Sequence, residues 1–133
     1  MPSQSLTSIS VTFGLSGSNF DPNSFTELVG IKPTKIWHQR HEHLKSRSDL
    51  PQLAWQYEIA RQPYPSIDEA TKQVLQPFLG KEEAINSFCH KNPCHAFVRC
   101  VIYGETQDVV LGLEPQTIVY LAGFNSNWSL GIV

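Results

Sequence analysis

Residues 8–16 read SISVTFGLS and decide the fold, because apolar and small polar side chains alternate strictly along them. Alternation with a period of two is typical of a β-strand with one face in a core and the other toward solvent. We therefore expect a half-buried strand, with its apolar side formed by Ile9, Val11, Phe13 and Leu15. A sheet of such strands has one buried face and one wetter face.

A helix is predicted directly after this strand. Asp21 is a favoured cap for a helix N-terminus, and Pro22 suits the first helical position because that N–H has no partner within the helix. Gly30 is predicted to end the helix, and Pro33 prevents its continuation. The remaining patterns predict a short edge strand at 36–37, a strand at 54–59, a helix from the Ser66 capping box, a helix at 81–90, a hairpin of strands 95–103 and 109–113, a helix at 114–123 and a last strand at 128–133.

The order of these elements predicts an α+β fold. We expect a single mixed, largely antiparallel sheet of about five strands, with helices packed mainly on one face. Residues 1–133 are predicted to form a single domain, with residues 1–7 as an N-terminal tail and residues 38–50 as a long charged loop.

The composition excludes several classes of protein. A formal net charge of −2 excludes a histone-like or ribosomal-type basic protein. Three cysteines are an odd and low number, which fits a reducing cytosol better than a secreted disulfide scaffold. The chain has no basic start and no apolar run of signal or membrane-spanning type. We therefore expect a cytoplasmic protein without membrane contact.

Several motifs follow one another along the chain in a recognisable order. They are Asn19-Phe20-Asp21-Pro22, Leu28-Val29-Gly30-Ile31-Lys32-Pro33-Thr34, Trp55-Gln56-Tyr57, Leu113-Glu114-Pro115 and the final strand from Trp128 to Val133. Together they resemble the bacterial family called domain of unknown function 4279. The resemblance implies a small α+β domain, defines no catalytic residues and implies an immunity-type role for some members. The segment 38–50 departs from the family pattern, which has a shorter connector there.

The segment 32–47 is the most basic part of the chain, with five basic residues against one acidic residue. A cationic loop can contact an acidic protein surface or a phosphate, and Trp37 could anchor that contact. A solvated loop, charged for solubility, explains the same composition. We do not expect a nucleic-acid partner, because most of the remaining surface is acidic. The candidate partner-binding residues are Lys35, Trp37, His38, Arg40, His41, His43, Lys45 and Arg47.

Histidines in this segment offer an alternative function. His38, His41 and His43, with a carboxylate such as Asp49 or Glu58, could form a metal-binding, small-molecule-binding or active site. No single regular conformation aligns all three histidines, and their spacing differs from established zinc motifs. The leading expectation is therefore that the protein has no metal and no cofactor.

Cysteines and aromatic residues give two further candidate sites. Cys89-His90-x3-Cys94-His95 lacks the paired spacing of a zinc finger, so we expect buried, inert thiols at Cys89, Cys94 and Cys100. A second set could line a concave, ligand-binding face of the sheet, although we expect about half of its members in the core. This set is Trp55, Tyr57, Phe97, Val101 and Tyr103.

The sequence contains no catalytic constellation that we recognise. Residues 14–18 lack the final glycine of a nucleophile elbow, and the acid pairs at 68–69 and 82–83 fit the first turns of helices. We therefore expect a cytosolic, non-catalytic binding module, with an immunity-type protein that neutralises its partner through loops as one form of it. The remaining alternative is a self-associating module that pairs residues 128–133 across a homodimer.

Overall fold

The computed structural model describes residues 7–39 and 52–133. In chain order the elements are β1 (Ser8–Gly17), α1 (Pro22–Val29), β2 (Lys35–Gln39), β3 (Gln52–Gln62), α2 (Ile67–Leu75), η1 (Gln76–Phe78), α3 (Glu82–Lys91), β4 (Cys94–Tyr103), η2 (Thr106–Asp108), α4 (Pro115–Gly123) and β5 (Asn127–Ile132). Within the described ranges, no helix is long and apolar enough to cross a membrane. Residues 1–6 of the expected tail and residues 40–50 of the expected charged loop lie outside these ranges. Thr7 is buried rather than part of a tail, and His38 and Gln39 belong to β2 rather than to a loop.

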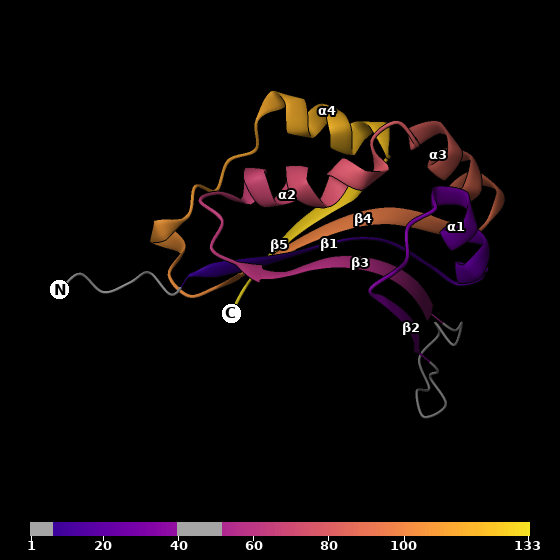
Figure 1. Ribbon diagram of the computed structural model, residues 1–133, viewed down its shortest axis with the longest axis horizontal. Helices are drawn as coiled ribbons and strands as arrows, with labels where there is room; N and C mark the ends of the chain where they lie inside the picture. Colours follow the sequence, from indigo (N-terminus) through magenta and orange to yellow (C-terminus); the bar gives the residue numbers. More distant parts are fainter. Residues whose placement is uncertain (1–6, 40–51) are drawn as a thin grey trace.

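Strand β1 occupies the centre of a five-stranded sheet whose order is β2-β3-β1-β4-β5. It pairs antiparallel with both β3 and β4, and β2 pairs antiparallel with β3. Only β5 joins in parallel, at the outer side of β4. The four helices lie together on one face of the sheet (Figure 1). The predicted α+β class, with a mixed and largely antiparallel sheet, is therefore confirmed.

Local capping explains where the first helices begin and end. The Asp21 carboxylate accepts a hydrogen bond from the Asn23 N–H at 3.0 Å, as expected for the N-cap of α1. Gly30 ends α1 with a φ of 71°, a left-handed conformation that glycine adopts without strain. The Ser66 hydroxyl accepts from the Glu69 N–H at 3.1 Å and caps α2.

The hydrophobic core lies between the sheet and the helices. All four apolar residues of β1, from Ile9 to Leu15, are fully buried. The Phe13 ring packs against those of Phe78 and Phe124, with centroids 4.4 and 5.4 Å away. Trp55 of β3 is also fully buried, and its Nε1–H donates to the Thr26 hydroxyl of α1 at 2.9 Å. The alternation in residues 8–16 thus fixes which side of the sheet the helices cover.

The predicted hairpin of strands 95–103 and 109–113 is wrong. The first of these strands is present as β4, but β1 and β5 occupy both of its edges and leave no place for a returning strand. In residues 109–113, Val110 instead forms one isolated bridge to Ser66. The segment crosses toward α4, and the chain returns to the sheet only at β5.

The alternative of self-association requires β5 to lie at an edge of the sheet, and it does lie there. The association itself stays a prediction.

Phe13 and Phe97 form a matched pair for testing this layering, because they place the same ring on opposite faces of the sheet. Phe13→Ala empties a fully buried site, so the free energy of unfolding should fall by about 3–5 kcal/mol. Phe97→Ala removes a partly buried ring and should cost less than about 2 kcal/mol. Urea unfolding followed by circular dichroism measures both losses. Equal losses would contradict a core confined to the helix side.

Candidate functional site

The face of the sheet that points away from the helices is the first candidate site. Within residues 7–39 and 52–133, no helix covers it (Figure 1). The strand registers identify the residues that share it, because directly paired residues of antiparallel strands point to the same side. One row runs from Lys35 through Gln56 and Gly14 to Phe97. We define the open face by its larger or charged side chains, which are Lys35, Trp37, Glu58, Arg61, His95, Phe97, Arg99, Val101 and Tyr103.

Two arginines of the open face lie over aromatic rings. The Arg61 guanidinium carbon lies 4.1 Å from the centroid of the Tyr103 ring, and the Arg61 Nε–H donates to the Ser8 hydroxyl at 3.2 Å. The Arg99 guanidinium carbon lies 5.9 Å from the centroid of the Phe97 ring. Such a cation–π contact contributes about 0.5–1 kcal/mol of attraction at exposed sites. The ring contact and the hydrogen bond to Ser8 together hold the Arg61 side chain in a defined position.

The charge of the open face differs in sign from that of the helical face. The open face carries three Lys and Arg residues, and Glu58 is its one carboxylate among the described residues. The four helices carry more acidic than basic residues, namely Glu27, Asp68, Glu69, Glu82 and Glu83 against Lys72 and Lys91. The described part of the molecule therefore presents a cationic, aromatic sheet face and an acidic helical face.

The structure separates the candidate partner-binding residues. Lys35 and Trp37 lie on the open face, and the Trp37 side chain is 40% exposed. His38 pairs with Leu53, which packs against the core, so His38 lies on the opposite face of β2. The other members of the set lie outside the described residues, and their role stays a prediction. They are Arg40, His41, His43, Lys45 and Arg47.

The histidine alternative gains no geometric support from the described residues. Glu58 lies on the open face, whereas His38 faces the other way, so these two proposed ligands do not converge. His41, His43 and Asp49 lie outside the described ranges. Within those ranges, no group of three or more His, Cys, Asp or Glu side chains is placed to hold a metal ion. A metal site involving the remaining histidines stays a prediction.

The aromatic set of the sequence divides between the two faces, as expected. Trp55 and Tyr57 lie on the core side, whereas Phe97, Val101 and Tyr103 lie on the open face. Sequence reasoning missed the arginines that accompany these rings. The alternation of Phe97 with Arg99 was a visible signal on β4. No such pattern marked Arg61, because an irregularity in the pairing of β1 with β3 sets the position of this residue beside Ser8.

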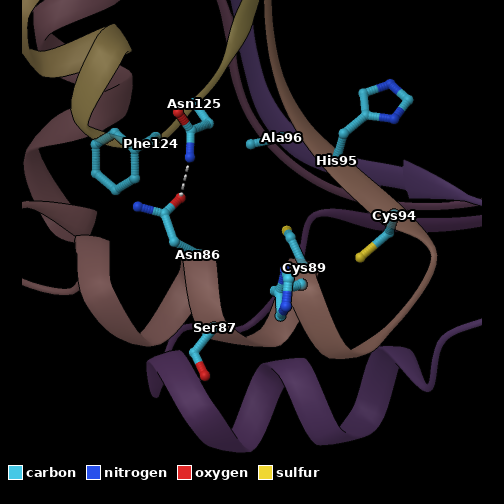
Figure 2. Close-up of a pocket in the computed structure, with 9 residues that line it drawn as sticks. Asn86, Ser87, Cys89, Cys94, His95, Ala96, Phe124 and Asn125 are labelled. Atoms are coloured by element: carbon cyan, nitrogen blue, oxygen red, sulfur yellow. Dashed lines mark hydrogen bonds between the residues drawn. The ribbon is translucent and has the colours of Figure 1, made fainter.

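A pocket of about 510 Å³ lies on the helical side of the sheet, where α3 meets the start of β4 (Figure 2). Cys89 and Cys94 both line it, and the Cys94 sulfur points toward Cys89, while the His95 ring points away. Strand alternation explains this separation, since His95 belongs to the open face. The other lining residues are Asn86, Ser87, His90, Ala96, Phe124 and Asn125.

The expectation of three buried thiols is correct for one cysteine. Cys100 is fully buried in the middle of β4, and its sulfur lies 3.4 Å from the Thr71 hydroxyl. Cys89 and Cys94 are only partly buried. Cys89 is in the last turn of α3 and Cys94 is the first residue of β4, so both lie at element ends that the core does not enclose.

Comparison with known proteins agrees with the order of motifs in the sequence. The model of the family described as Domain of unknown function (DUF4279) matches residues 7–131. The chain belongs to this family. The match includes both candidate sites and every strand and helix described above, apart from Ile132 at the end of β5. No curated protein and no solved structure matches the chain.

The exposure of Trp37 on a cationic face can be tested by fluorescence quenching. Trp55 is fully buried and Trp128 is partly buried, so Trp37 should supply most of the emission that iodide quenches. Iodide should quench more strongly than caesium, because Lys35 attracts an anion to this face. The Trp37→Phe variant should lose most of the quenchable fraction. An unchanged quenchable fraction in that variant would contradict the placement of Trp37.

Proposed function

We propose that this DUF4279 chain is a cytosolic, non-catalytic binding module that holds an acidic protein partner on its open face. One observation carries the proposal: basic and aromatic side chains gather on the one sheet face that the described helices leave uncovered. Tyrosine, tryptophan and arginine are the residue types that most often dominate binding energy at protein interfaces. All three occur together on this face.

The arginines of the open face suit the recognition of carboxylates. A guanidinium group is planar and can donate two parallel hydrogen bonds to one carboxylate. Stacking on Tyr103 and the hydrogen bond to Ser8 restrict Arg61 before a partner arrives, so less side-chain entropy is lost on binding. Trp37 adds an exposed apolar surface beside Lys35 at the β2 end of the same face.

The unequal charge of the two faces favours one orientation of an acidic partner. Attraction to the open face and repulsion from the acidic helices act together during encounter. An immunity-type role, in which the module neutralises a toxin by covering it, is the most specific form of this proposal. The resemblance of the motifs suggested that form, and the candidate residues of 40–47 would then extend the contact beyond β2.

A pull-down from native lysate tests the proposal with two matched charge reversals. Lys35→Glu with Arg99→Glu alters the open face, and Lys81→Glu with Lys91→Glu makes the same change in charge around α3. The open-face variant should lose at least about tenfold of the captured partner, because removing a hydrogen-bonded interfacial charge costs about 2 kcal/mol or more. The α3 variant should retain it.

Two results would count against the proposal. Equal capture by both variants would mean that the open face is not the interface. Loss of the captured material after nuclease treatment would mean that the partner is a nucleic acid rather than an acidic protein. Circular dichroism of both variants shows whether each retains the fold, so that a loss of binding reports on the surface.

A further inference from the structure

The pocket beside α3 contains two thiols that the proposed binding function does not use. Cys89 and Cys94 both line it, with the Cys94 sulfur directed toward Cys89, and both remain partly accessible to solvent (Figure 2). Two neighbouring thiols in an accessible pocket are a chemical feature different from the buried Cys100. Accessible thiols, unlike buried ones, can react with solutes.

The backbone between the two cysteines holds them together. The Asn92 N–H donates to the Phe88 carbonyl at 3.0 Å, and the Cys94 N–H donates to the Asn92 carbonyl at 2.7 Å. These bonds turn the chain back at Pro93, so that β4 starts beside the last turn of α3. Ser18, the residue after β1, supports the turn from outside, because its N–H donates to the Pro93 carbonyl at 3.2 Å. The thiol pair is therefore positioned by the fold rather than by chance contact.

The two thiols are chemically unequal. A hydrogen bond with Cys94 lowers the pKa of the Cys89 thiol, although burial acts in the opposite direction. The same hydrogen bond, burial and the charge of a Cys89 thiolate all raise the pKa of Cys94. The last turn of a helix disfavours a thiolate, so the Cys94 S–H is the group that offsets this effect. Of the two thiols, Cys89 is therefore the one that loses its proton more readily.

We propose that Cys89 and Cys94 form a dithiol site for low-molecular-weight disulfides, with Cys89 as the attacking residue and Cys94 as the resolving residue. The pocket provides room for the small disulfide beside Cys89. Cys100 takes no part, because it is fully buried. This site is independent of the open face and of any partner bound there.

The reaction proceeds in two exchange steps. The Cys89 thiolate attacks one sulfur of the disulfide, forms a mixed disulfide, and releases the other sulfur as a thiolate that takes a proton from solvent. Cys94 then gives its proton to solvent and attacks the Cys89 sulfur. The Cys89–Cys94 disulfide forms and the second small thiol leaves. Two protein thiols are oxidised, and one small disulfide is reduced to two thiols.

The first step prepares the second. Once Cys89 is in a mixed disulfide, it no longer carries the negative charge that raises the pKa of Cys94. Cys94 therefore loses its proton more readily at the stage when it must attack. Because Cys94 already lies beside Cys89, closure is intramolecular and should outpace attack by a second small disulfide.

Peptide mapping can locate every product, because trypsin separates the three cysteines. Cleavage after Lys81, Lys91 and Arg99 places Cys89 in 82–91, Cys94 in 92–99 and Cys100 in 100–133. The folded, full-length protein is incubated with oxidised glutathione, free thiols are blocked with N-ethylmaleimide, and the digest is kept unreduced. The wild type should yield peptides 82–91 and 92–99 linked by a disulfide, with Cys100 unmodified.

Single variants separate the two roles. Cys94→Ser should stop at one glutathione on Cys89, and this adduct should form at least about tenfold faster than the adduct on Cys94 in Cys89→Ser. Unfolding in guanidinium should abolish the difference among the three cysteines. The proposal is overturned if the wild type accumulates glutathione on Cys89 without closing, if the two single variants react equally fast, or if the folded and unfolded proteins give the same pattern.

Discussion

One face of β1 must be excluded from water, and the arrangement of the other strands and helices depends on this requirement. β1 is the central strand, so its alternation determines which side chains of β3 and β4 point into the core. Its apolar side is fully buried under the helices. A shift of one residue in the pairing would turn Phe13 toward solvent and a serine or threonine toward the core, which a buried layer cannot accommodate without an unpaired hydroxyl.

The other side of β1 determines the form of the open face, because its residues are small. Gly14 is the clearest case: a side chain there would place its Cβ 2.9 Å from the Phe97 ring and 2.3 Å from the Trp55 carbonyl oxygen. The ring of Phe97 therefore lies across the centre of the sheet, where a larger residue would displace it. With small residues in the middle, the larger side chains of β2, β3 and β4 make up the open face. The core pattern and the shape of the open face thus come from the same strand.

Local patterns predicted the parts of this structure that depend on neighbours in the chain. The β1 alternation, the Asp21 cap and the Gly30 end of α1 are decided within a few residues, and all were predicted correctly. The strand that pairs with the outer edge of β4 was predicted wrongly. Hairpin patterns favour pairing between adjacent segments, whereas β5 follows α4 in the chain. Of the candidate residues, Lys35 and Trp37 share the open face, but strand alternation sends His38 away. The contact of Arg61 with Tyr103 and the exposure of Cys89 depend on tertiary packing and have no local signature.

The central claim is that the open face is where a partner binds, and residue-level oxidation in the captured complex tests it most directly. Hydroxyl radicals modify accessible aromatic side chains, and mass spectrometry locates each product. Partner binding should protect Trp37, Phe97 and Tyr103, while Tyr120 on α4 serves as an internal reference and keeps its reactivity. Protection of Tyr120 with unchanged oxidation of the three open-face aromatics would contradict the account and place the interface on the helical side.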